Sequence, residues 1–115
     1  MNNLILVING GHDTDVLKSS FEANNFQVFF VSDEYEALQM AQDVRPRMIL
    51  IDLEVNPLTK CSVMKTYLAE VGIPTIALGA NQELMRRPFI SLFDGFLEKP
   101  FGHGAVRSLV NTFLN

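Results

Sequence analysis

Residues 48–52 read Met48-Ile49-Leu50-Ile51-Asp52, an unbroken apolar run that ends in a carboxylate and is followed by loop-like sequence. Such a run is typical of a strand that is buried on both faces, as the strands of parallel sheets are. A lone carboxylate at the end of a buried strand is costly unless it has a partner or a task. Asp52 is therefore the first candidate functional residue of the chain.

Apolar runs of this kind alternate along the chain with stretches in which apolar residues recur at helical spacing. The expected strands cover residues 4–8, 26–31, 48–53, 74–78 and 95–97. This alternation indicates a parallel sheet with helices on both faces. The right-handed crossover rule then predicts a flavodoxin-like, three-layer α/β sandwich with strand order 2-1-3-4-5.

Five helices are expected between and after these strands. The first, capped by Asp13 or Thr14, turns Leu17 and Phe21 inward, and the second begins near Asp33 and ends before the proline at position 46. A third helix is expected after Ser62, with Gly72 as a left-handed terminator, and a fourth is expected to break at Pro88. The last helix should start after residues 102–104. Its expected buried residues are Val106, Leu109, Val110 and Phe113.

Length and charge restrict the class of protein. The chain has 115 residues, 48% of them hydrophobic, which predicts one globular domain over residues 1–115. The formal net charge is −4, and no basic stretch exceeds Arg86-Arg87, so we expect no binding to nucleic acid or to an anionic membrane. Cys61 is the single cysteine, which suits a reducing compartment. The apolar run at residues 4–8 is too short for a membrane span or a signal peptide, so we expect a cytoplasmic protein.

A second signal lies near the end of the chain, where residues 95–101 read Gly95-Phe96-Leu97-Glu98-Lys99-Pro100-Phe101. In the predicted sheet, the carboxyl ends of strands one, three and five meet at the switch point of the strand order. Asn9-Gly10, Asp52 and Lys99 are therefore predicted neighbours. An ion pair between Asp52 and Lys99 with a structural role alone is an alternative to a functional site.

Together, Asp52 and the Lys99-Pro100 pair resemble the response-regulator receiver domain, and in particular chemotaxis receivers. In that family an aspartate that ends the third strand accepts a phosphoryl group. A lysine that ends the fifth strand, followed by a cis proline, contacts the phosphoryl oxygens. The resemblance implies that Asp52 is the candidate phosphoacceptor and that Lys99 is its cationic partner.

The magnesium site of the family departs from its usual pattern here. The family holds the ion with an acidic pair after the first strand, where this chain has Asn9-Gly10. The remaining ligands that the resemblance implies are Asp52, the amide oxygen of Asn9 and the backbone carbonyl of Glu54. Asp13 could reach back to the ion, although an aspartate at a helix start is more often an N-cap. We expect magnesium binding to be weak or absent, because this ion requires near-octahedral oxygen ligands.

The switch residues of the family are also altered. Gly79 stands where the family has a serine or threonine that donates a hydroxyl to the phosphoryl group, so that charge-assisted hydrogen bond is missing. Phe96 occupies the aromatic position that follows this hydroxyl, and packing in the core is its alternative role. The resemblance thus implies a switch that is uncoupled.

The leading hypothesis is an atypical receiver module of a two-component or phosphorelay pathway, not an enzyme, that is phosphorylated weakly or not at all. Its expected partner is a histidine kinase or another signalling protein. A homodimer could form through the last helix and the stretch that begins at Leu84 and ends at Phe93.

Two other functions stay open at this point. The first is a regular phosphorylation switch in which Asp13 assists magnesium. The second is a flavodoxin-like domain that binds a nucleotide or flavin phosphate at Gly10-Gly11, a weak signal because no phosphate-binding fingerprint follows. His12 and His103 lack a partner at metal-binding spacing and are expected at the surface.

Overall fold

The computed structural model describes residues 3–8, 14–32, 34–53, 72–80 and 93–114. Its elements follow one another along the chain in the order expected of an α/β protein. They are β1 (Leu4–Ile8), α1 (Thr14–Glu22), β2 (Gln27–Val31), α2 (Glu34–Asp43), β3 (Met48–Asp52), β4 (Thr75–Ala80), β5 (Gly95–Lys99) and α5 (His103–Phe113). The expected third and fourth helices lie outside the described residues.

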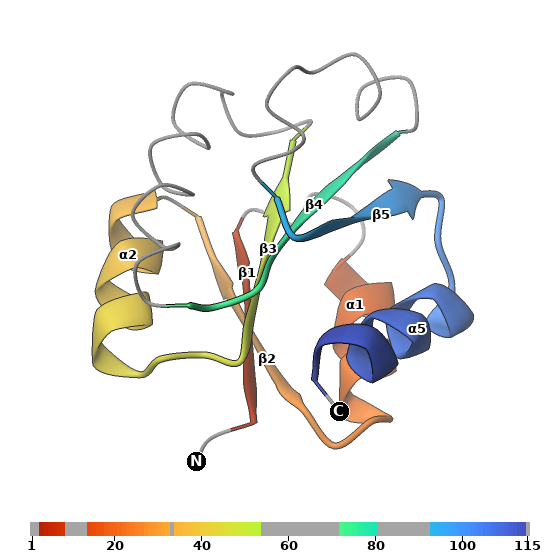
Figure 1. Cartoon of the computed structure of the whole chain (residues 1–115), viewed down its shortest axis with the longest axis horizontal. Coiled ribbons are helices and arrows are strands. Elements are labelled where there is room, and N and C mark those ends of the chain that lie inside the picture. Colours follow the sequence, from red (N-terminus) through yellow and green to blue (C-terminus); the bar gives the residue numbers. More distant parts are fainter. Residues whose placement is uncertain (1–2, 9–13, 33, 54–71, 81–92, 115) are drawn as a thin grey trace.

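The strands form one parallel sheet in the order β2-β1-β3-β4-β5, as predicted (Figure 1). The β3 strand lies at the centre, and each of its residues is fully buried. Helix α2 covers one face of the sheet, whereas α1 and α5 lie together on the other face. The flavodoxin-like three-layer fold is therefore confirmed.

The side chains of each strand divide between two hydrophobic cores, because successive residues of a strand point to opposite faces. On β3, Ile49 and Ile51 belong to the core under α2, together with Ala37 and Ala41 of that helix. Met48 and Leu50 belong to the core under α1 and α5, which contains Phe21 and the expected apolar residues of α5. Residues on both faces therefore hold β3 in place.

Two details of the helices differ from the sequence expectation or refine it. Helix α5 starts at His103, so Gly104 lies within its first turn and not before it. The sequence expectation placed the start too late because glycine was taken as a boundary, whereas the first turn of a helix tolerates it. Phe113 is half-buried and packs against the core under α1 and α5. No helix among the described residues is long and apolar enough to cross a membrane.

Gly72 has a backbone φ of +72°, the left-handed conformation that the sequence predicted for this position. A Cβ added at Gly72 would meet no atom within 4 Å, and the same holds for Gly104 in α5. The two glycines therefore differ in backbone conformation and not in available space.

This difference predicts opposite effects of the same substitution. Gly72→Ala should lower the free energy of unfolding by about 1 kcal/mol, because an L-residue is strained in the left-handed region. Gly104→Ala should raise it by about 0.5–1 kcal/mol, because the helical backbone suits alanine and the unfolded chain loses freedom. Urea unfolding of both variants measures the two values. A neutral Gly72→Ala variant would contradict the left-handed backbone at this turn.

Candidate functional site

The Asp52 carboxylate and the Lys99 ammonium form an ion pair at the carboxyl edge of the sheet. Lys99 Nζ lies 2.8 Å from Asp52 Oδ2 and donates a hydrogen bond to it. The side chain of Asp52 is 0% exposed and that of Lys99 is 14% exposed. Because the carboxylate is removed from water, the ammonium provides charge compensation that solvent does not.

The register of the sheet explains how residues from two separated strands meet. Asp52 pairs with Leu78 of β4, and Leu78 pairs with Leu97 of β5. Lys99 therefore lies two residues beyond the level of Asp52 in the strand direction. Strand β4 lies between β3 and β5, so these two strands are about 10 Å apart. The short side chain of Ala80, which pairs with Lys99, leaves room for the lysine to extend across β4.

Alternation along the strands places both charged groups on the same face. Asp52 shares the face of Leu50, and Lys99 shares the face of Leu97, and both of these leucines belong to the core under α1 and α5. The peptide bond between Lys99 and Pro100 is cis. The predicted pairing of Asp52 with Lys99 and the order of lysine and cis proline are thus both present.

No protein-family model matches the sequence, and no curated protein matches it significantly. The fold, in contrast, resembles solved structures along its whole length. The chemotaxis response regulator CheY4 of Vibrio cholerae is 16% identical, with a TM-score of 0.78 over 99% of this chain and 100% of that chain. A signal receiver domain from Bermanella marisrubri is 16% identical, with a TM-score of 0.81 and full coverage of both chains.

A third similar structure is the receiver domain of the sensor histidine kinase PA1611 from Pseudomonas aeruginosa, solved with a magnesium ion in its active-site cleft. It is 20% identical, with a TM-score of 0.80 over 98% of each chain. The chain has the receiver-domain fold.

In this receiver fold Asp52 is the single carboxylate of the implied magnesium set whose position is described. Asn9, Asp13 and Glu54 lie outside the described residues, and so does His12. Within the described ranges, no group of three or more acidic, histidine or cysteine side chains could hold a metal ion. One oxygen of Asp52 accepts a hydrogen bond from Lys99, so the ammonium already offsets part of the charge that a cation would meet.

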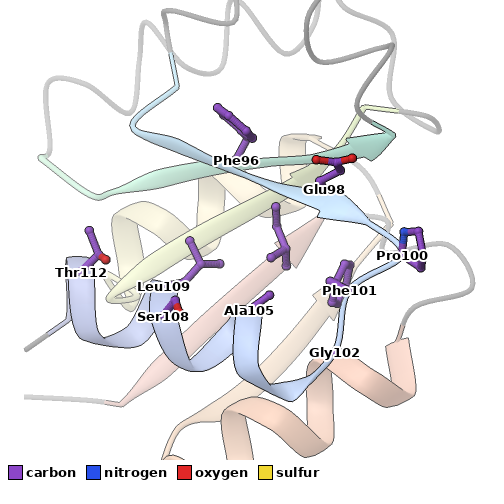
Figure 2. Close-up of a pocket in the computed structure, with 10 residues that line it drawn as sticks. Phe96, Glu98, Pro100, Phe101, Gly102, Ala105, Ser108, Leu109 and Thr112 are labelled. Carbon is purple, nitrogen blue, oxygen red and sulfur yellow. The ribbon is translucent and has the colours of Figure 1, made fainter.

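The two positions that the resemblance assigned to a switch have different surroundings. Gly79 is buried on β4, one residue beyond the position paired with Asp52, and it offers no hydroxyl. Phe96 is 53% exposed on β5, so the alternative that it packs in the core is wrong. Successive side chains of a strand point to opposite faces of the sheet. Leu97 points into the core under α1 and α5, so Phe96 points to the other face, where it is exposed (Figure 2).

A surface pocket of about 510 Å³ lies between the edge of β5 and helix α5. Figure 2 shows Phe96 and Glu98 on the side of β5 away from α5, and Ala105, Ser108 and Thr112 along the helix. Phe93, which the sequence placed in a partner surface, is 7% exposed and belongs to the core under α2. The rest of that predicted stretch, from Leu84 onward, lies outside the described residues.

Helices α1 and α5 are joined by a side-chain contact that was not expected from the sequence. Ser20 Oγ, which is buried, lies 2.6 Å from Nδ1 of His103, which is exposed as predicted. A serine on the apolar face of the α1 pattern was the available signal, because a buried hydroxyl requires a hydrogen-bonding partner. This contact fixes which side of α1 faces α5.

The unequal burial of the ion pair predicts unequal effects of removing each partner. Lys99→Met should lower the free energy of unfolding by about 3 kcal/mol, because it leaves a fully buried carboxylate without this ammonium. Asp52→Asn should cost only about 1 kcal/mol, because the partly exposed ammonium retains solvent and a neutral acceptor. Urea unfolding measures both losses, and the double variant should lose less than their sum. Equal losses in the two single variants would argue against burial as the cause.

Proposed function

We propose that this chain is a receiver module of a two-component or phosphorelay signalling pathway, in an atypical form that acts mainly through protein–protein contacts rather than as an enzyme. The observation that carries the proposal is the buried Asp52–Lys99 ion pair at the carboxyl edge of a receiver fold. The aspartate ends β3 and the lysine ends β5, which are the positions that the resemblance assigns to the phosphoacceptor and to its cationic partner.

Phosphorylation of Asp52 would require its carboxylate oxygen to attack phosphorus while the bond to the leaving group breaks, which yields an acyl phosphate. Repulsion between the carboxylate and an anionic donor opposes this attack unless nearby cations cancel it. Lys99 supplies one such charge, and its ammonium is in contact with the attacking group. If magnesium were bound, Asp52 would be one of its carboxylate ligands, and the ion would supply further positive charge.

Two substitutions weaken this chemistry in the present chain. Asn9-Gly10 replaces the acidic pair that the resemblance leads one to expect, so fewer carboxylates are available for a divalent cation. Gly79 removes a hydroxyl whose charge-assisted hydrogen bond to the phosphoryl group is worth about 1.5–3 kcal/mol. Both losses act on the same developing charge, so their effects are not independent. We propose that Asp52 is phosphorylated slowly or not at all.

The Asp52–Lys99 pair then sets one resting conformation of the site. A partner would recognise this conformation directly, and the exposed surface at β5 and α5 is the proposed contact region. Phe96 presents an apolar ring there, beside the pocket that lies against α5. A histidine kinase or another signalling protein is the proposed partner.

The test is exposure of the purified chain to excess acetyl phosphate with magnesium, followed by intact-mass measurement. The wild type should gain little or no phosphoryl mass. A variant with Asn9→Asp, Gly10→Asp and Gly79→Thr should be modified at least about tenfold faster, because it regains the metal carboxylates and the hydroxyl.

Asp52→Asn placed in that triple variant is the matched control, and it should abolish the added mass. Rapid modification of the wild type at Asp52 would contradict the atypical form and restore a regular switch. Failure of the triple variant to gain phosphoryl mass would contradict the assignment of Asp52 and Lys99 to a phosphotransfer site.

A further inference from the structure

Strand β2 is an edge of the sheet, at the end opposite to β5 (Figure 1). Its sequence, Gln27-Val28-Phe29-Phe30-Val31, contains no charge and no proline. Natural proteins usually protect edge strands with lysine, proline or a bulge, because an open edge accepts another strand. The register of β2 against β1 runs without interruption through all of its residues, so this edge lacks a bulge as well.

The hydrogen bonds to β1 show which backbone groups point outward. The Gln27 N–H donates to the Asn3 carbonyl at 2.8 Å, so Gln27 directs its backbone groups toward β1. In a parallel ladder this direction alternates from residue to residue. Val28 and Phe30 therefore direct both N–H and C=O away from the sheet, toward the open edge.

We propose that this edge pairs with the β2 edge of a second copy of the chain, in antiparallel orientation. Pairing through the outward groups places Val28 opposite Phe30 of the second copy, and Phe30 opposite Val28 of that copy. Phe29 then lies on the two-fold axis. The two sheets become one continuous sheet, with helices α1 of both copies on the same face.

The side chain on the axis favours a second copy as the occupant. Phe29 is 45% exposed, although it is a large apolar residue at the middle of the strand. Residues that face each other at a non-hydrogen-bonded position of an antiparallel pair have Cα atoms about 4.5 Å apart, so their side chains touch. Each Phe29 would cover the other, and an aromatic pair at this spacing is favourable.

The size of this contact sets the expected affinity. A pair of short strands, with α1 and α2 of each copy on the two faces of the joined sheet, lies at the low end of protein interfaces, near or below about 1,200 Å² in total. We therefore expect a weak dimer that forms at high protein concentration, for example between about 20 μM and 1 mM, and not a permanent one.

Sedimentation equilibrium over this concentration range tests the pairing. Phe29→Lys should weaken self-association at least about tenfold, because it places two positive charges on the axis. Val28→Pro should weaken it as well, because it removes an outward N–H for which the described residues provide no acceptor. Circular dichroism of both variants checks that the monomer is folded. Phe29→Lys acts through a side chain, whereas Val28→Pro acts through a backbone N–H. If one variant misfolds, the other still tests the pairing.

Phe96→Lys is the matched control, because Phe96 is a phenylalanine that is 53% exposed, more than Phe29, on the opposite edge strand, β5. It should leave the association unchanged. In a Cys61→Ser background, Phe29→Cys should form a disulfide between two copies on mild oxidation, whereas Phe30→Cys should not, because residue 30 faces residue 28 of the second copy.

Three results would overturn the proposal. The first is a wild type that stays monomeric up to the highest concentration. The second is a dimer that Phe96→Lys abolishes and Phe29→Lys does not, which would place the contact at the other edge. The third is equal cross-linking of the two cysteine variants, which would exclude the register with Phe29 on the axis. None of these results depends on phosphorylation of Asp52.

Discussion

A fully buried carboxylate at the end of the central strand constrains this structure more than any other single group. Asp52 ends β3, whose residues are enclosed by side chains on both faces of the sheet. An ionised group in that position requires a counter-charge, and Lys99 provides it at 2.8 Å. Because Lys99 belongs to β5, the pair joins two strands that are not paired through their backbones and lie on either side of β4. The charge requirement of one residue thus helps to fix the position of the edge strand.

The same pair relates stability to the proposed function. A phosphoacceptor must keep its carboxylate available, whereas a structural ion pair holds the carboxylate in one arrangement. Under the proposed function this chain meets the second condition, because Asn9-Gly10 and Gly79 lack the carboxylates and the hydroxyl that would help a phosphoryl group to replace the Lys99 contact. On that proposal, the pair maintains one conformation that a partner recognises.

The two edges of the sheet offer different surfaces for such recognition. The β5 edge carries Phe96, contains the charged residues Glu98 and Lys99, and adjoins the pocket against α5. The β2 edge carries Phe29 on a strand without charged residues. A charged edge strand resists pairing with another strand, whereas an uncharged one favours it. The sheet could therefore support two contacts that do not overlap.

The sequence by itself determined the strands, their order and the candidate pair. Buried parallel strands require continuous apolar runs, and the crossover rule leaves few orders for five of them, so Asp52 and Lys99 had to fall at the same edge of the sheet. Only the tertiary structure decided which apolar side chains lie outside the core. The exposure of Phe96 and Phe29, the burial of Phe93 and the contact between Ser20 and His103 all depend on which elements lie beside them. Residue spacing within one element gives the face on which a side chain lies, but neighbours that are distant in the sequence decide whether that face is covered.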